Sequence, residues 1–229
     1  MKILAFDTST DACSTALFVD GVITEEFIIA PQQHSQLLLP MLNSVLAKAE
    51  ITLDDIDAFA FGRGPGSFTG LRIAASVVQA LAFAKNRPVL PVSTLHAMAQ
   101  GYAQEIPKNT NKKLGMLVCL DARMQEIYCG AFCEDTSLGI MPIDEEKVSQ
   151  PELIKLPAGD YVWHGVGNGW ASYAKQLEEV PVQSIQSDIY PKASNIVALA
   201  AIAYQKGEAV TSEKAVPVYL RNDVAWQNG

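Results

Sequence analysis

The residues best suited to chemistry lie in a glycine-rich segment, GRGPGSFTG, at residues 62–70. Glycines permit positive φ angles and a close backbone approach, and free N–H groups at the start of a following helix can bind an anion. The segment is not a P-loop, because no lysine follows its last glycine, and it lacks the GxSxG register of a nucleophile elbow. Two interpretations stay open, an anion site or a structural turn, and the residues concerned are Gly64, Gly66, Ser67 and Thr69.

Two aspartates could complete a nucleotide site with this loop. Asp7 and Asp121 each end an apolar strand beside small polar residues, in DTST and DAR. Such carboxylates can hold Mg²⁺ through water and orient attack on a phosphate, whereas a solvated turn carboxylate is the simpler interpretation of each. Arg123 could pair with a phosphate or with a nearby carboxylate. The candidate nucleotide residues outside the loop are therefore Asp7, Thr8, Ser9, Asp121 and Arg123.

The histidines and cysteines argue against a metal site and a self-contained hydrolase. The three histidines, at 34, 96 and 164, form no HxxxH or HExxH pair. The four cysteines, at 13, 119, 129 and 133, form no CxxC pair and stand in apolar, strand-like text. A zinc set needs closely spaced thiolates or imidazoles, so we expect buried, reduced thiols and no metal.

Composition indicates a soluble protein whose own surface is not suited to binding nucleic acid without a partner. The chain has 229 residues, 49% of them hydrophobic, and a formal net charge of −8. Its apolar runs are shorter than the roughly 18–20 residues of a membrane span, and its start lacks a secretory profile, which predicts a cytoplasmic protein without membrane contact. Phosphate binding needs clustered cations, and the densest basic stretch, residues 107–113, looks like a solvated loop. If RNA is involved, we expect a partner to hold most of it.

Hydrophobic periodicity predicts two similar α/β halves. Asp20-Gly21 between apolar runs predicts a hairpin, and stripes of period 3.6 predict helices at 35–49 and 70–85. Further helices are expected from Ser93 to Ala103, from the loop after residue 166 to Glu179, and after a Ser194 cap. Residues 6–18 and 120–132 share a strand–Asp–turn–strand pattern at an offset of 114, which favours a duplicated domain over two unrelated hairpins. We expect domains at 1–105 and 106–229, with the C-terminal tail packing back on the first.

Five stretches spread over the chain resemble the TsaB (YeaZ) family: DTST, HSQLLLPML, GRGPGSFTGLRI, DARMQEIY and PVYLR. The resemblance implies the ASKHA (actin-like, sugar-kinase and chaperone ATPase) fold, an α/β fold of duplicated ribonuclease H-like domains. It also implies a role in forming threonylcarbamoyladenosine next to the anticodon of tRNAs that read A-starting codons. In that pathway the paralogue TsaD carries the metal and transfers the group, TsaB is its required, catalytically silent partner, and TsaE is an ATPase bound by the pair. ATP or ADP would bind at most weakly, or at the interface with the partners.

The resemblance further implies that helices 34–48 and 70–84 form the contact with TsaD, or with a second copy when the chain is isolated, and that the glycine loop positions the second helix. Which face of each helix is core and which is interface stays open. The candidate contacts are His34, Leu38, Leu42, Val45, Ala74, Val77, Val78 and Leu81. Two other functions stand as alternatives: a glycopeptidase-like hydrolase acting on its partner, and an active ATPase or small-molecule kinase.

Overall fold

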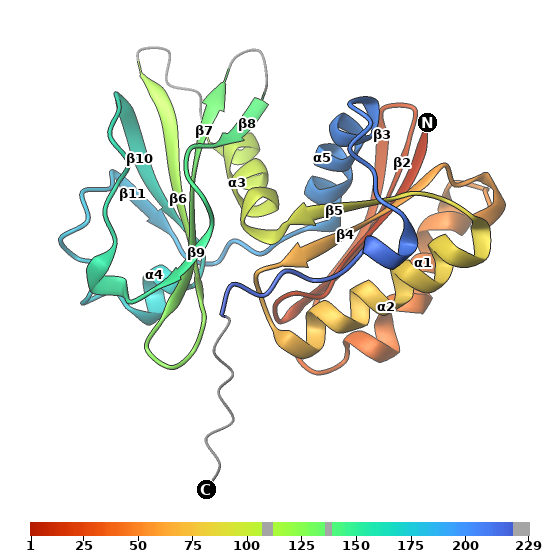
Figure 1. Ribbon diagram of the computed structural model, residues 1–229, viewed down its shortest axis with the longest axis horizontal. Coiled ribbons are helices and arrows are strands. Elements are labelled where there is room, and N and C mark those ends of the chain that lie inside the picture. Colours follow the sequence, from red (N-terminus) through yellow and green to blue (C-terminus); the bar gives the residue numbers. More distant parts are fainter. Residues whose placement is uncertain (107–111, 136–138, 222–229) are drawn as a thin grey trace, which may run out of the picture.

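A mixed five-stranded sheet forms the first lobe of the computed structural model, which describes residues 1–106, 112–135 and 139–221 (Figure 1). The sheet order is β3-β2-β1-β4-β5, in which β1, β4 and β5 run parallel and β2 is antiparallel to both its neighbours. The elements are β1 (Lys2–Asp7), β2 (Ala12–Val19), β3 (Val22–Ile29), α1 (His34–Lys48), β4 (Ala58–Gly64), α2 (Phe68–Lys85) and β5 (Val89–Ser93), with a 3-10 turn at Leu53–Asp55.

Helices cover both faces of this sheet, which explains why its central strands are almost wholly apolar. Leu4 and Phe6 point to the face under α1 and α2, whereas Ile3 and Ala5 point to the opposite face under helix α5 (Ala193–Gln205). Figure 1 shows α1 and α2 together on one side of the sheet and α5 on the other.

The second lobe repeats the first. Its sheet order, β8-β7-β6-β10-β11, reproduces the first order strand for strand, with the same parallel and antiparallel pairs. Asp7 ends β1 and Asp121 ends the equivalent strand β6, at the predicted offset of 114. The predicted α/β fold of two duplicated domains is thereby confirmed. The elements are β6 (Lys113–Asp121), β7 (Ile127–Asp135), β8 (Gly139–Pro142), β9 (Lys147–Ser149, paired with β7), β10 (Tyr161–Val166), α4 (Gly169–Ser172) and β11 (Ser184–Gln186), with a 3-10 turn at Pro151–Leu153.

Two helices cross between the lobes, so that each packs on the sheet formed by the opposite half of the chain. Helix α3 (Thr94–Glu105) precedes the second sheet in sequence, and its Met98 and Tyr102 pack with Val118 and Phe132 of that sheet. Helix α5 follows the second sheet but covers the first one. A division at residue 105 therefore does not describe the packing, because each lobe contains a helix from the other side of that boundary.

Several predicted elements differ in extent. The helix expected to reach Glu179 is only the short α4, which ends at Ser172. Ser194, expected to cap the last helix, lies inside α5, whose N-cap is Lys192. The first three residues of the glycine-rich segment belong to β4. Ser93 caps α3 as predicted, accepting a hydrogen bond from the His96 N–H at 3.1 Å. Residues 107–111 of the basic stretch and the tail beyond 221 lie outside the described residues, and in the described part no helix is long and apolar enough to cross a membrane.

Candidate functional site

The glycine loop is packed against the chain's own backbone. The Ser67 N–H donates to the Ser9 carbonyl at 2.7 Å, and the Thr8 hydroxyl donates to the Gly70 carbonyl at 2.6 Å. A Cβ added at Gly66 would lie 2.4 Å from the Ser9 carbonyl oxygen, and one at Gly70 would lie 1.9 Å from the Thr8 carbonyl oxygen. These glycines are therefore needed for the approach of the 7–9 turn. The geometry favours the structural turn over the anion site, because the contact fixes where α2 begins.

Asp7 is sealed inside the first lobe. Its Oδ1 accepts hydrogen bonds from the Ser9 N–H at 3.0 Å and the Ser9 hydroxyl at 2.8 Å. Its Oδ2 faces Gly62 and has no hydrogen-bond partner. Burial raises the pKa of Asp7 from 3.8 to about 7, against the opposing effect of the Ser9 bonds. A buried carboxyl of this kind organises the turn and is poorly placed to hold hydrated Mg²⁺.

The cleft between the lobes brings together only part of the predicted nucleotide site. A cavity of about 410 Å³ is lined by Ser9, Gly66 and Ser67 from the first lobe and by Asp121 and Arg123 from the second, whereas Asp7, Thr8, Gly64 and Thr69 are not part of its wall. Asp121 Oδ1 accepts from the Arg123 N–H at 2.8 Å and from the Tyr173 hydroxyl at 3.0 Å, and its Oδ2 lies 3.1 Å from Arg123 Nη1.

These lining residues do not fit a magnesium nucleotide. Both arginines in the wall, Arg123 and Arg221, already bind carboxylates of their own chain, Asp121 and Glu126. The Ser67 N–H of the glycine loop is bonded to the Ser9 carbonyl of the 7–9 turn, and Asp7 is buried away from the cavity. Among the described residues, no group of three or more His, Cys, Asp and Glu side chains could hold a metal ion.

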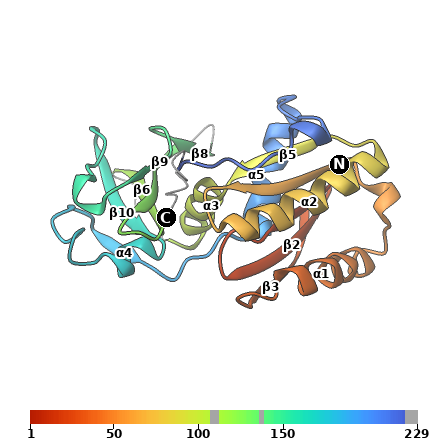
Figure 2. The same cartoon turned by 60° about the horizontal axis from the view of Figure 1, so that its bottom comes forward.

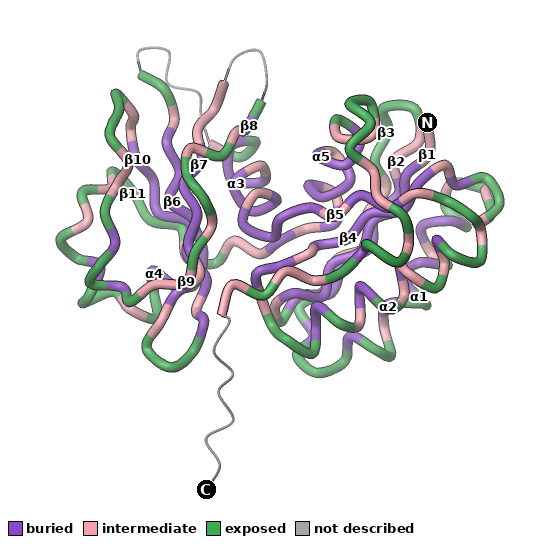
Figure 3. Tube along the Cα trace, in the orientation of Figure 1, coloured by how far each residue is buried: buried purple, intermediate pink, exposed green. Residues whose placement is uncertain are grey.

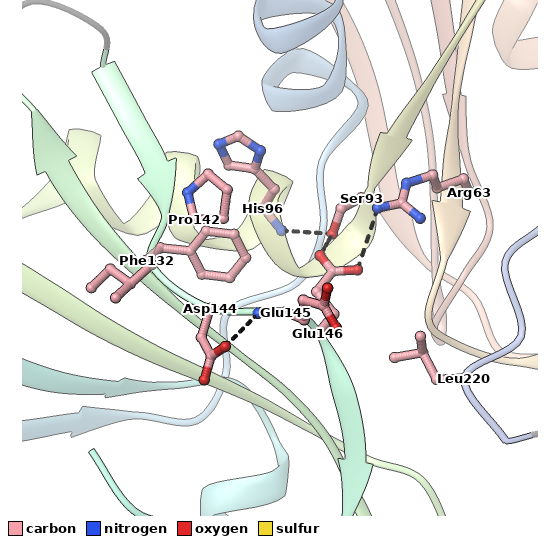
Figure 4. Close-up of a pocket in the computed structure, with 10 residues that line it drawn as sticks. Arg63, Ser93, His96, Phe132, Pro142, Asp144, Glu145, Glu146 and Leu220 are labelled. Carbon is pink, nitrogen blue, oxygen red and sulfur yellow. Dashed lines mark hydrogen bonds and ion pairs between the residues drawn. The ribbon is translucent and has the colours of Figure 1, made fainter. Parts of the chain in front are cut away.

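A second cavity, of about 590 Å³, lies between the lobes and contains a polar tie between them (Figure 4). Glu146, from the loop after β8, accepts a hydrogen bond from the Ser93 hydroxyl and lies 3.5 Å from Arg63 Nη2. Burial raises the pKa of Glu146, partly offset by Ser93 and Arg63. Beside them, His96 donates from Nε2 to the Ile140 carbonyl at 2.7 Å, stacks on Phe132, and has a pKa lowered by burial. Sequence reasoning missed this group, since no motif links residues so far apart.

The periodic apolar stripes of α1 and α2 form part of the hydrophobic core of the first lobe. Six of the eight predicted contacts are buried within the first lobe: His34, Leu38, Leu42, Val45, Ala74 and Val78. The His34 ring lies 3.2 Å from the Ala12 carbonyl, which its Nε2–H can reach as a donor. The prediction that these six side chains contact a partner at the surface is therefore wrong. The widest apolar stripe of a helix is the one that packs on its own sheet. The other two, Val77 and Leu81, are half-buried at the edge of that core.

The outward side of the two helices, which we call the α1–α2 face, is nearly uncharged. It carries a groove of about 460 Å³ lined by residues that include Leu39, Phe68, Ile73 and Val77. Leu39 is 51% exposed, Phe68 53% and Phe83 76%. The two helices lie side by side at the surface (Figure 2), with exposed positions facing away from the sheet (Figure 3). Both helices are fully described, and Lys48 and Arg72 are their only charged side chains in the exposed class.

The chain is similar to known proteins over nearly its whole length. Residues 20–228 match the family model described as TsaD, tRNA N6-adenosine threonylcarbamoyltransferase. The Escherichia coli tRNA threonylcarbamoyladenosine biosynthesis protein TsaB is 38% identical over 231 residues, which cover 99% of this chain and 97% of that protein. The Haemophilus influenzae protein of the same name is 37% identical, covering 99% and 96%.

A solved structure described as YeaZ from Pseudomonas aeruginosa superposes with a TM-score of 0.88 at 39% identity, covering 96% of this chain and 99% of that one. Sequence and structure therefore agree, and the chain belongs to the TsaB (YeaZ) family of tRNA threonylcarbamoyladenosine biosynthesis proteins.

Proposed function

We propose that this chain is a non-catalytic subunit that binds a TsaD-type transferase through the α1–α2 face. Together with TsaE, the pair transfers the threonylcarbamoyl group to the adenosine next to the anticodon of tRNAs that decode A-starting codons. The observation that carries the proposal is the exposed, almost uncharged α1–α2 face on a chain with a net charge of −8. Depletion of charge around exposed aromatic and aliphatic side chains is typical of the core of a protein interface.

The side chains in the cleft favour an accessory role for this chain over a catalytic one. Arg123 pairs with Asp121, Arg221 pairs with Glu126, and the glycine loop binds the 7–9 turn, so these groups already have partners within the chain. In this proposal the chain works in the cytoplasm, the transferase supplies the metal and the chemistry, and the tRNA is held mainly by the other subunits. The isolated chain self-associates through the same face, because an uncovered apolar surface favours a symmetric dimer.

The test is a titration of the chain with TsaD from the same organism, followed by light scattering. Leu39→Glu and Ile73→Glu place a charge in the groove, where an unpaired buried carboxylate is costly, and we expect at least tenfold weaker binding. Leu153→Glu is the matched control, since Leu153 is 65% exposed and lies in the second lobe. Equal binding by all three variants would exclude the α1–α2 face as the docking surface.

The same mixture tests the hydrolase alternative. A glycopeptidase-like enzyme that acts on its partner would shorten TsaD during incubation, and intact-mass measurement would detect the product. We expect the mass of TsaD to stay constant, and a truncated TsaD would contradict a non-catalytic role.

A further inference from the structure

The segment after α5, residues 209–221, forms a strap across the first lobe. It begins beside β5, where the backbones of Val210 and Val89 exchange hydrogen bonds at 2.8 and 2.9 Å. Its Ala215 carbonyl accepts from the Gln79 side chain of α2 at 2.9 Å, and its Val218 N–H donates to the Arg63 carbonyl of β4 at 2.8 Å. Apart from a 3-10 turn at Ser212–Lys214 it has no regular structure, so its path depends on these separate anchors (Figure 1).

Near its end the strap becomes part of the α1–α2 face. The Tyr219 ring packs against Phe68 at the start of α2, with 5.3 Å between ring centroids. The Arg72 guanidinium lies over the same Phe68 ring, 3.7 Å from its centroid, and Arg72 Nε donates to the Tyr219 hydroxyl at 3.1 Å. Phe68 and Tyr219 are both more than one-third exposed, so this cluster of three side chains sets the shape of one end of the docking surface.

Two residues later the strap is tied to the other lobe. Arg221 Nη2 donates to the Ala122 carbonyl at 3.2 Å and to the Glu126 carboxylate, and it lies 3.5 Å from the Arg123 carbonyl. All these acceptors belong to the turn between β6 and β7. Bonds between a guanidinium and a carboxylate are about twice as strong as neutral hydrogen bonds. Arg221 is therefore the principal described contact by which the end of the strap binds the second lobe.

We propose that Arg221 is a positioning residue for partner binding: by tying the strap to the β6–β7 turn it holds Tyr219 against Phe68 and Arg72. The inference rests on the proposed docking function and adds a residue that lies in the cleft rather than on the α1–α2 face. The physical reason is entropic. A segment without regular structure stays ordered only where contacts offset its conformational freedom, and Tyr219 stands between one anchor at Val218 and one at Arg221. Without the second anchor, the cluster on Phe68 opens and the partner must reorder it on binding.

The proposal predicts that a charge swap restores part of the binding lost in each single variant. Arg221→Glu and Glu126→Arg each place like charges together, and each single variant should bind TsaD about tenfold more weakly. The double variant Arg221→Glu/Glu126→Arg should recover part of the lost binding, because the ion pair is restored with reversed sign while the bond to the Ala122 carbonyl is not. Lys214→Glu is the control, since it makes the same change of charge in the strap while lying on the first lobe.

A second readout needs no partner. In the isolated chain, nuclear Overhauser contacts between the Phe68 and Tyr219 rings should be lost in Arg221→Glu, kept in Lys214→Glu and regained in part in the double variant. Ring contacts that survive Arg221→Glu, or that are lost equally in Lys214→Glu, would overturn the inference. Failure of wild-type binding to TsaD would instead refute the docking function, and the ring contacts would still decide whether Arg221 positions Tyr219.

Discussion

Replacing Asp7 by asparagine should stabilise the protein at high pH and have much less effect at low pH. Asp7 is fully buried, and one of its carboxyl oxygens has no hydrogen-bond partner. Burial disfavours the ionised form, which is why the pKa of Asp7 rises from 3.8 to about 7. Asparagine keeps an oxygen that can accept from Ser9, and it stays neutral at every pH.

The sign and the size follow from proton linkage. Between pH 3.8 and 7 the folded chain retains a proton on Asp7 that the unfolded chain has lost, so the free energy of unfolding falls as the pH rises. The contribution is fully present below pH 3.8 and is lost as the pH passes through about 7. Each pH unit in this window is worth about 1.4 kcal/mol, so the wild type should lose about 2.5 kcal/mol relative to Asp7→Asn between pH 5 and pH 8.

The assay is urea unfolding followed by far-ultraviolet circular dichroism at pH 5, 6, 7 and 8. Asp11→Asn is the control, because it removes a negative charge from an exposed position in the same turn. The quantity to compare is the difference in unfolding free energy between variant and wild type at each pH. A difference that stays constant within about 0.5 kcal/mol, or one that favours the wild type as the pH rises, would refute the account of Asp7 as a sealed carboxyl.

Three further outcomes follow from the packing. Gly70→Ala should lower the free energy of unfolding by about 2–3 kcal/mol in urea titrations, since its Cβ would lie 1.9 Å from the Thr8 oxygen; an unchanged midpoint would contradict the tight turn. Glu146→Ala should lower the free energy of unfolding by about 1–3 kcal/mol through loss of the polar tie between the lobes, whereas Glu145→Ala, at an exposed neighbour, should not. A thiol reagent should label Cys133 first in the native chain, because the other three cysteines are buried and burial raises their pKa values; early labelling of any of those three would count against this packing.

The sequence predicts those elements whose signals are local. The Asp20-Gly21 dipeptide lies in the hairpin between β2 and β3, with both residues at positive φ, and the Ser93 side chain caps α3. The 114-residue offset locates the equivalent strands β1 and β6 because the same short pattern of strand, aspartate and turn recurs. Each of these features is decided by neighbours within a few residues.

The site is harder to predict because it depends on contacts between distant residues. The stripes of α1 and α2 identify apolar faces, but a stripe has the same period whether it covers a sheet or a partner. Leu38 and Val78 are therefore buried, while Leu39, one position along, is exposed. The group of Arg63, Ser93 and Glu146 spans 83 residues of sequence and has no pattern to reveal it.

The crossing of α3 and α5 between the lobes has a consequence for how the chain folds as it leaves the ribosome. The face of the first sheet that carries Ile3 and Ala5 is covered by Ile196 and Val197, which are synthesised almost 200 residues later. At about 5–20 residues per second, that face waits roughly 6–20 s after β5 has emerged before α5 exists to cover it. The first lobe therefore cannot be completed in order of synthesis. A nascent chain arrested before α5 should recruit a chaperone, and one arrested well beyond it should not.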